Sequence, residues 1–454
     1  MKRLLLVSYG FPPVSRVQSQ GAGKLAAGLA RRGWEVHALT VADPPTFLFD
    51  ETLTDELPVN VTTHTAYSLE PTRALQWLRG LRRGLARERT GESMAQQPKP
   101  TAPPPEPERS YTSLPQPAVK LLRALFFPDE KIGWAPFAVR EAHRLHGEEP
   151  FDAVVSTGPP YTAHVIARRF ARRTGVPWLA VLMDPVVGCY AFPPVTPVHA
   201  WLARRLESQI ARDAAAITTA TRPWADALVS RNPSAATRVS LLPNGFDPND
   251  FPDEPMPLHE GFCVAYVGTF QLSIKPDTFL DAVARLLADP DMARDLRISF
   301  VGPRDPDTEA ALTARGLSER VERTGLVPHG QAVRRMRQAD VLLFVLGPEP
   351  ESADILTGKL PEYLASGAAV IAEAPEGVAT DVVRRSGAGL VCRPGDREGM
   401  ANALSEQYNM WRDGRLPAPA PNVVAEFNRD RALDRLTATL ATILKDDPDA
   451  DRPS

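Results

Sequence analysis

Short apolar runs alternate with amphipathic stretches along the first half of the chain, and these are the patterns of buried strands and of helices. A loop rich in Gly, Pro, Ser and Gln at 10–21 follows the first run and leads into a helix that extends to about Arg32. Further elements are expected in turn: strands at 2–8, 35–41, 151–156, 177–182, 215–219 and 239–242, and helices at 161–173 and 195–211. This alternation predicts a parallel, doubly wound sheet.

The alternation begins again after the turn-rich segment 243–247 and a linker to about Glu260. This second series has expected strands at 262–268, 296–302, 320–325, 341–346 and 369–372, and helices at 277–287, 308–315, 331–337 and 358–366. We therefore expect an α/β fold of two Rossmann-like βαβ domains, 1–245 and 246–423, with ligands bound at the carboxyl ends of the strands in a central cleft. The last segment, 424–454, is expected to form an amphipathic helix at 424–444 that crosses back to the first domain, followed by a fraying acidic tail.

One segment of different composition interrupts the first domain. Residues 87–117 include a stretch at 96–107 that is rich in Pro, Glu, Gln and Ser, and such a segment buries too little apolar surface to offset the entropy cost of ordering. We expect a disordered surface insertion, with a lid or an acceptor-binding loop as the alternative. The apolar run 121–127 that follows is expected to be a core helix, and contact with a membrane-bound lipid carrier is its alternative.

Composition and charge narrow the function classes. A chain of 454 residues with 43% hydrophobic content supplies enough apolar material for two cores, and a formal net charge of −3 gives no basic field for nucleic acid. The three cysteines, Cys189, Cys263 and Cys392, stand alone, which argues against a disulfide framework and a zinc site. The apolar run after Met1 is too short for a signal sequence or a membrane span. We therefore expect a cytoplasmic protein, either a monomer or a homodimer.

Candidate chemistry is densest in the segment 357–367. Thr357 and Gly358 stand at the start of a predicted helix, where unpaired N–H groups and the positive end of the helix dipole attract a diphosphate. Lys359 lies in the first turn, and Glu362 shares its face and could accept from ribose hydroxyls. On spacing alone, a surface helix with one Lys/Glu pair is the favoured alternative.

The segment Gly358-Lys359-Leu360-Pro361-Glu362-Tyr363-Leu364-Ala365-Ser366-Gly367 resembles the G-K-L-x-E-Y-L-A-x-G segment of the family 4 glycosyltransferases, which have the GT-B fold. Other matches occur in order along nearly the whole chain: Gly10-Phe11-Pro12-Pro13, Gly23-Lys24-Leu25-Ala26, Arg32-Gly33-Trp34-Glu35-Val36, Pro243-Asn244-Gly245-Phe246-Asp247, Tyr266-Val267-Gly268-Thr269-Phe270, Gly325-Leu326-Val327-Pro328-His329 and Gly387-Ala388-Gly389. The resemblance implies transfer of a sugar from a UDP- or GDP-sugar to a small-molecule, natural-product or glycan acceptor.

The resemblance also implies which residues bind the donor. Glu362 would bond the ribose, and Asp354 would reach the donor sugar, with Glu351 as the alternative for that role. Lys275 would neutralise the diphosphate, although a solvated loop lysine remains the alternative. The base would lie near Val327 and Pro328. The donor-binding set is Gly268, Thr269, Lys275, Gly302, Arg304, Val327, Pro328, Thr357, Gly358, Lys359, Leu360 and Glu362.

The N-terminal half, which holds the acceptor in this family, departs more from the pattern. Gln20, Gly21 and Ala22 stand where relatives usually have arginines, and only Asp184 and Pro185 remain of a longer acidic and aromatic run. The acceptor-binding set is Pro13, Ser15, Gln18, Gln20, Gly21, Lys24, His164 and Asp184. A capping or core histidine is the alternative for His164. These departures point to an unusual acceptor or to lost activity.

The resemblance implies a transfer that retains the anomeric configuration, by stabilisation of the leaving group rather than through a covalent nucleophile. The catalytic set is His164, Lys275, Lys359 and Asp354, with no obligatory cofactor or metal and the nucleotide sugar as co-substrate. Two alternatives remain: a sugar-nucleotide epimerase or hydrolase of the same fold, and a non-catalytic partner that retains the nucleotide-sugar pocket.

Overall fold

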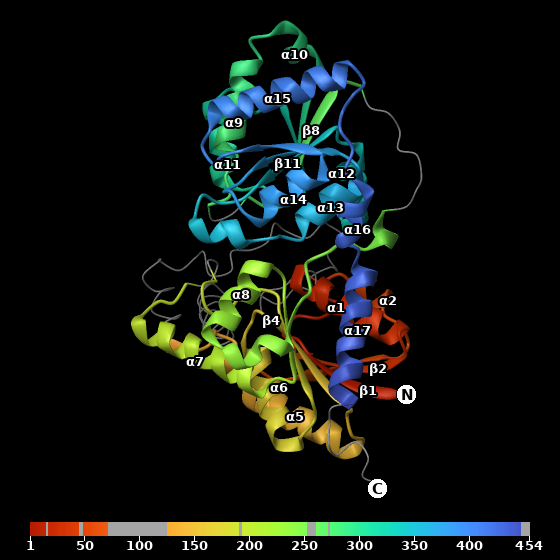
Figure 1. Cartoon of the computed structure of the whole chain (residues 1–454). Helices are drawn as coiled ribbons and strands as arrows, with labels where there is room; N and C mark the ends of the chain where they lie inside the picture. Colours follow the sequence, from red (N-terminus) through yellow and green to blue (C-terminus); the bar gives the residue numbers. More distant parts are fainter. Residues whose placement is uncertain are drawn as a thin grey trace, which may run out of the picture. The chain divides into compact units, whose positions relative to one another are not determined.

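The computed structural model describes residues 1–14, 17–44, 49–70, 125–189, 193–251, 260–270 and 273–445. The chain divides into two compact units (Figure 1). Unit 1 comprises Met1–Thr219, Ala225–Leu241 and the residues from Arg435 on, and unit 2 comprises Ala220–Trp224 and Leu242–Asp434. The expected insertion at 87–117 and the tail after Lys445 lie outside the described residues, as do the first four residues of the run 121–127.

Unit 1 is built on a parallel sheet, which has the order β3-β2-β1-β4-β5-β6-β7 in the described part of the chain. Its strands are β1 Lys2–Val7, β2 Trp34–Val41, β3 Val61–Ala66, β4 Ala153–Gly158, β5 Trp178–Leu182, β6 Ala216–Thr219 and β7 Val239–Leu241. The connecting helices are α1 Val17–Arg31, α2 Thr52–Asp55, η2 Ile132–Trp134, α5 Ala135–Glu148, α6 Thr162–Thr174, α7 Pro197–Asp213, α8 Arg222–Arg231 and η3 Pro233–Arg238.

The main core of unit 1 lies on one face of this sheet. Side chains alternate between the two faces of a strand, so Leu5 and Val7 of β1 point to the same face, where they join a cluster with Ile166, Phe170 and Ile210. These last three residues come from α6 and α7, which lie next to each other and beside α5 in the view of Figure 1. Helices α6 and α7 thus pack against this face of the sheet and support the strands whose carboxyl ends lead into the loops.

Unit 2 is built on a second parallel sheet, of order β10-β9-β8-β11-β12-β13 among the described residues. Its strands are β8 Phe262–Val267, β9 Leu296–Val301, β10 Val321–Gly325, β11 Val341–Val345, β12 Ala369–Glu373 and β13 Gly389–Cys392. Its helices are η4 Pro248–Asp250, α9 Asp277–Leu286, α10 Pro290–Asp295, α11 Pro306–Ala314, α12 His329–Gln338, η5 Pro350–Asp354, α13 Lys359–Ser366, α14 Val378–Ser386, α15 Arg397–Arg412 and α16 Pro421–Glu426, and α17 Arg429–Lys445 follows.

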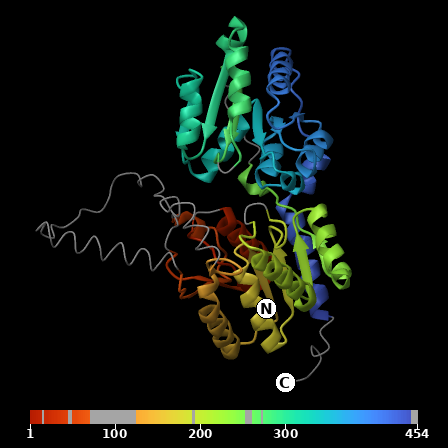
Figure 2. The same ribbon diagram turned by 90° about the vertical axis from the view of Figure 1, so that its left-hand side faces the viewer.

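Helices cover both faces of this second sheet (Figure 2). Val264 and Tyr266 of β8 point to the face covered by α9 and α15, whereas Ala265 and Val267 point to the face covered by α13 and α14. This alternation of buried side chains is the pattern of a central strand in a doubly wound sheet. The expected α/β fold with two parallel sheets is therefore confirmed.

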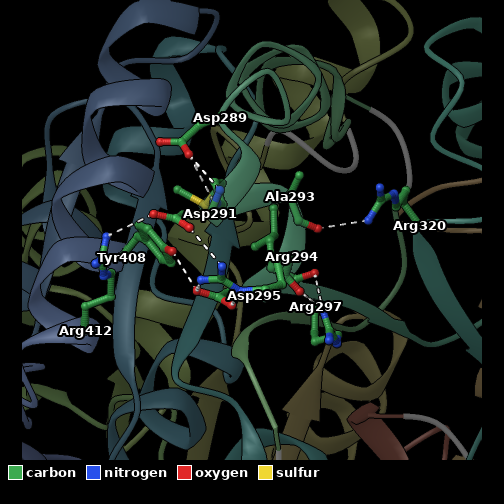
Figure 3. A network of polar contacts seen from close by, with 11 residues as sticks. Asp289, Asp291, Ala293, Arg294, Asp295, Arg297, Arg320, Tyr408 and Arg412 are labelled. Carbon is green, nitrogen blue, oxygen red and sulfur yellow. Dashed lines mark hydrogen bonds and ion pairs between the residues drawn. The ribbon is translucent and has the colours of Figure 1, made fainter.

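A charged network fastens the amino end of β9 (Figure 3). The hydroxyl of Tyr408 on α15 donates to Asp295 at 2.7 Å, and Arg294 contacts Asp295 at 2.8 Å and Asp291 at 2.9 Å. Arg412 lies 3.8 Å from Asp291. This network joins α10 to α15. Since it lies at the amino end of β9, and ligands of parallel sheets bind at the carboxyl ends of the strands, it is not part of a candidate site.

Several elements differ from the sequence predictions. The first helix begins at Val17, inside the expected loop 10–21. Gly23 on this helix lies so close to that loop that a Cβ there would be 2.6 Å from Pro12. The expected helix 424–444 is two helices, since Asn428 breaks it and accepts from the N–H of Asp430 at 2.8 Å as a cap. The sequence reasoning missed β3, α5, α8, α14, β13 and α15.

Candidate functional site

Glycines line the carboxyl ends of β8, β9 and β10 in unit 2. Gly268 donates its N–H to Val301 at 2.8 Å, and Gly302 donates to Gly325 at 3.1 Å. Gly302 has a φ of +148°, and a Cβ there would lie 2.0 Å from the carbonyl oxygen of Gly268. Only glycine fits such a close approach of backbones. The loops therefore leave backbone exposed where a ligand of a parallel sheet binds.

Helix α13 begins beside these loops with no side-chain cap. Its N-cap residue is Gly358, which has no side chain to accept from the N–H groups of the first turn. Pro361 in that turn has no N–H, and the remaining N–H groups can bind an anion. The side-chain amide of Asn244 donates to the carbonyl of Leu356, two residues before Gly358, at 2.9 Å. Thr357 lies between Leu356 and Gly358, and its buried Oγ1 has no hydrogen-bond partner among the described residues.

Lys359 lies beneath the loop at Gly268. Its Nζ donates to the hydroxyl of Tyr266 at 2.8 Å and lies 4.7 Å from the centre of that ring, while the Tyr266 hydroxyl donates to the carbonyl of Thr269 at 3.0 Å. A Cβ at Gly268 would lie 2.4 Å from this Nζ. Burial lowers the pKa of Lys359 to about 8, although the carboxylate of Glu362 acts in the opposite direction. Lys359 is thus a half-buried cation whose direct partner in the described structure is a neutral phenol.

Two tyrosines of this region were not assigned to the site by the sequence reasoning. Tyr266 supports the ammonium, and Tyr363 on the next turn of α13 accepts from the N–H of Val267 at 2.9 Å and donates to the carbonyl of Val267 at 3.1 Å. Burial raises the pKa of both phenols. A tyrosine four residues after the lysine lies on the same helix face, and this spacing could have revealed Tyr363.

The two predicted carboxylates stand on either side of the start of α13. Glu362 is half-buried in the first turn, and its charge acts on Lys359. Asp354 ends η5, is also half-buried, and has its pKa raised by burial, whereas Glu351 is exposed. Leu360 points its side chain into the core, so it could reach a ligand only through its backbone.

The other two predicted cations have partners of their own. Lys275 forms an ion pair with Asp307 of α11 at 2.7 Å, which raises its pKa. Arg304 lies in a polar groove with Glu322 and donates to the carbonyl of Arg323 at 3.4 Å. Neither side chain is hydrogen-bonded or ion-paired to a residue of α13 in the described part of the chain, and their roles in donor binding stay predictions.

The loop after β10 has one feature that sequence reasoning missed. Val327 packs against the core and Pro328 precedes α12, but Leu326 between them and Gly325 is 61% exposed. His329, the first residue of α12, pairs with Asp250 of η4 at 3.0 Å. An exposed leucine beside a glycine-rich loop offers an apolar surface to a flat ring.

Unit 1 has a pocket of about 420 Å³ at the carboxyl ends of β1, β4 and β5. Apolar side chains make most of its wall: Phe126, Phe127, Pro128, Pro159, Pro160, Met183, Val186, Val187, Pro193, Pro194, Val195, Ala200, Ala203 and Leu206. Asp129 and Lys131 also line it. The carboxyl group of Asp129 accepts from the N–H and hydroxyl of Thr162 at 3.0 and 2.7 Å, and burial raises its pKa to about 6.

A buried ion pair supports one side of this pocket. Lys131 contacts Glu70 at 2.6 Å, and the Glu70 side chain is fully buried. The hydroxyl of Tyr9 also donates to Glu70, and the ammonium of Lys131 lies 5.1 Å from the Tyr9 ring centre. Glu70 and Lys131 are 61 residues apart, so sequence spacing gave no sign of this pair.

The predicted acceptor-binding residues are only partly gathered here. Gln18 lines the pocket, and Gly21 on α1 and Asp184 after β5 adjoin its wall through Met183, which lies 3.7 Å from a Cβ placed at Gly21. Burial raises the pKa of Asp184 to about 6. The remaining members of the set are not pocket-lining residues: Pro13 in the loop after β1, and Gln20 and Lys24 on α1, while Ser15 lies outside the described residues.

His164 is fully buried in unit 1. Its Nδ1 lies 2.8 Å from the hydroxyl of Ser156, which accepts from the indole N–H of Trp178 at 2.8 Å. The other ring nitrogen, Nε2, is buried without a hydrogen-bond partner among the described residues, and burial lowers the pKa to about 3. This placement favours the core-histidine alternative, and a catalytic role for His164 stays a prediction.

Membrane-spanning helices and metal-binding clusters are both absent from the part of the chain that the structure describes. None of the described helices is long and apolar enough to cross a membrane. Within the same part of the chain, no group of three His, Cys, Asp or Glu side chains comes together as ligands for a metal ion. The expectations of a cytoplasmic location and of no obligatory metal stay predictions.

Two doubly wound sheets, one with a glycine-lined helix N-terminus beside a buried lysine, are typical of α/β proteins that bind phosphorylated ligands. Residues 261–409 match the family described as glycosyl transferases group 1, and residues 93–245 match the glycosyl transferase 4-like domain. These two matches together cover more than half of the chain. The chain belongs to the group 1 glycosyltransferases with a family 4-like N-terminal domain, and it is an enzyme that uses a nucleotide-sugar donor.

Similar individual proteins agree with this assignment. The chain is 26% identical over 321 residues to the 2-deoxystreptamine glucosyltransferase of Streptomyces kanamyceticus, covering 66% of this chain and 76% of that protein. Sucrose-phosphate synthase of Thermosynechococcus elongatus is 17% identical with a TM-score of 0.64, over 98% of this chain and 100% of that one. HepE of Anabaena, solved with UDP and glucose, is 14% identical with a TM-score of 0.62, over 97% and 100%. The two structures establish the GT-B fold.

Proposed function

We propose that this enzyme transfers a sugar from UDP- or GDP-sugar to a small-molecule, natural-product or glycan acceptor, with retention of the anomeric configuration. The main support for a donor site is the environment of Lys359. This half-buried cation lies at the N-terminus of α13 and is hydrogen-bonded to the neutral Tyr266. A cation kept out of water without a direct carboxylate contact is costly. A bound diphosphate supplies the missing negative charge.

The residues around Lys359 suggest a role for each part of the donor. The N–H groups of the first turn of α13 and the loop at Gly268 would bind the diphosphate, and Thr357 would donate its unpaired hydroxyl to it. Glu362 would accept from the ribose, and Asp354 from a hydroxyl of the sugar. The base would rest on the loop of Leu326 and Val327. HepE, which shares the fold, was solved with UDP-glucose, and this makes a UDP-sugar the first donor to test.

The proposed reaction exchanges one bond at the anomeric carbon for another and moves one proton. The bond from the anomeric carbon to the diphosphate oxygen breaks, and the acceptor heteroatom bonds to the same carbon on the same face. The proton of the acceptor passes to the departing diphosphate oxygen. Lys359 and the helix N-terminus stabilise the charge that develops on the diphosphate, so catalysis consists mainly of positioning and electrostatic stabilisation.

The test measures binding of UDP, GDP and UDP-glucose by calorimetry and thermal shift. A ligand at about 100 times its Kd stabilises the folded protein by about 2.7 kcal/mol. The stabilisation should be lost in Lys359→Ala and in Glu362→Ala, and retained in Lys445→Ala, a matched change at an exposed lysine. If the Lys359→Ala variant binds these ligands as tightly as the wild type, the donor site is elsewhere. Release of UDP without any acceptor would instead favour an epimerase or hydrolase.

A further inference from the structure

We propose that the pocket of unit 1 binds the apolar, ring-bearing body of the acceptor, so that the acceptor is a hydroxylated hydrophobic compound rather than a sugar or an aminocyclitol. This inference rests on the proposed function, because it names the acceptor of the same reaction. The pocket volume of about 420 Å³ lies within the range of roughly 300–1,000 Å³ for small-molecule sites.

The wall of the pocket has the chemistry of an apolar site. Phe127, Val186, Val187 and Leu206 line it, and Tyr161, which follows β4, adds an aromatic residue to the wall. Burial of a ligand's apolar surface here gains about 25 cal/mol for each Å² removed from water. Flat or fused rings bury the most surface for the least loss of conformational entropy.

The polar groups in the wall are mostly occupied within the protein. Asp129 is bonded to Thr162, Lys131 to Glu70, and the hydroxyl of Tyr161 to the carbonyl of Pro185 at 2.7 Å. The hydroxyl of Thr157 likewise donates to that of Ser8 at 3.0 Å. A polyhydroxylated acceptor would lose its water in this pocket and find few unpaired partners, which costs binding energy for each unpaired group.

A small polar region remains at the edge of the pocket. Gln18 on α1, Glu130 before η2 and Arg204 on α7 line it, and none of these side chains is hydrogen-bonded to another of the described residues. These few groups suit one or two hydroxyl or carbonyl oxygens on an otherwise apolar ring system. The pocket also lies at the carboxyl ends of the strands, where ligands of doubly wound sheets bind.

The experiment compares two probes on the full chain. One is 4-methylumbelliferone, a fluorescent, hydroxylated, fused-ring compound, and the other is 2-deoxystreptamine, a polar aminocyclitol. Fluorescence titration and equilibrium dialysis should show that 4-methylumbelliferone binds at least roughly tenfold more tightly. Absence of measurable binding up to about 1 mM, or tighter binding of 2-deoxystreptamine, overturns the proposal.

Variants tie the binding to this pocket. Ala203→Trp fills the pocket from α7, and Val187→Asp places a charge in its wall. Each should weaken 4-methylumbelliferone binding by roughly tenfold or more, whereas Ser208→Trp, at an exposed position on the same helix outside the pocket, should leave it unchanged. Retained binding in both pocket variants overturns the proposal, and circular dichroism of each variant shows that it is folded.

A separate measurement distinguishes this inference from the proposed function. UDP binding should be the same in Ala203→Trp and in the wild type, because the variant alters unit 1 and the donor site is in unit 2. If the pocket variants bind 4-methylumbelliferone as tightly as the wild type while UDP binding is intact, only the proposed acceptor class is refuted. Absence of UDP binding with the probe results as expected refutes the donor reaction and leaves the apolar pocket standing.

Discussion

Replacement of Lys359 by methionine is expected to make unit 2 more stable while it removes the affinity for nucleoside diphosphates. Methionine fills a similar volume and packs well against the ring of Tyr266, but it carries no charge that must be taken out of water. The wild-type lysine is held half-buried and charged, and burial lowers its pKa from 10.5 to about 8. The wild type is thus expected to be less stable than the variant, because it keeps a buried charge that can bind an anion.

The size of the effect follows from the change in pKa. A fall from 10.5 to about 8 corresponds to about 3 kcal/mol against the folded state at neutral pH, where lysine is charged in both folded and unfolded chains. Because the unfolded chain binds this proton more tightly, stability rises with pH between about 8 and 10.5. At pH 10 the folded lysine is mostly neutral, and only about 1 kcal/mol of the penalty remains.

The assay is thermal unfolding of the wild type and Lys359→Met at pH 7 and at pH 10, with and without UDP. In a domain of this size about 3 kcal/mol corresponds to a rise in Tm of about 6–12 °C at pH 7, and UDP identifies the transition of unit 2 in the wild type. Lys445→Met, at an exposed position, controls for the loss of a charge. A variant that melts at or below the wild-type temperature at pH 7, or a difference that does not shrink at pH 10, would refute the reasoning.

Three further changes test the same structure. Gly268→Ala places a Cβ 2.4 Å from Nζ of Lys359, so calorimetry should show roughly tenfold weaker UDP binding with unchanged circular dichroism. Glu70→Gln leaves the ammonium of Lys131 buried without its carboxylate and should cost about 3–5 kcal/mol in urea unfolding of unit 1, whereas removal of both charges should cost less. Tyr363→Phe leaves a backbone N–H and carbonyl of β8 without their partner and should lower the stability of unit 2 by about 1–3 kcal/mol, as read from its Tm.

The local structure around α13 was largely predictable because its signals are local in sequence. Helix α13 occupies 359–366, one residue from its expected start, and the spacing of Thr357, Lys359 and Glu362 places them together at one helix end. Lys275 shows the limit of such reasoning. It occupies the expected loop, but Asp307 on a different helix pairs with it, and no spacing rule contains that contact.

The arrangement of side chains in unit 1 was less predictable because it depends on contacts between distant segments. Strand β3 was missed since its residues, VTTHTA, are mostly exposed and lack an apolar alternation. His164 carries the chemistry of a catalytic residue, yet it lies in the core beside Trp178 and Ser156. The pocket itself is formed by Phe127, Val187 and Leu206, which no periodicity in the sequence joins.

The pairing of Glu70 with Lys131 has a consequence for how this enzyme could diversify. Leu69 also donates its N–H to the carbonyl of Gly133 at 3.2 Å, so the chain leaves the sheet after β3 and returns to the same point before α5. Closing a long loop costs little more than closing a short one, and here a buried ion pair fixes both ends. A change in the number of residues between these two anchors would therefore add little to the entropy cost of bringing Glu70 and Lys131 together, so the chain length there could vary over evolution while β3 and α5 keep their positions.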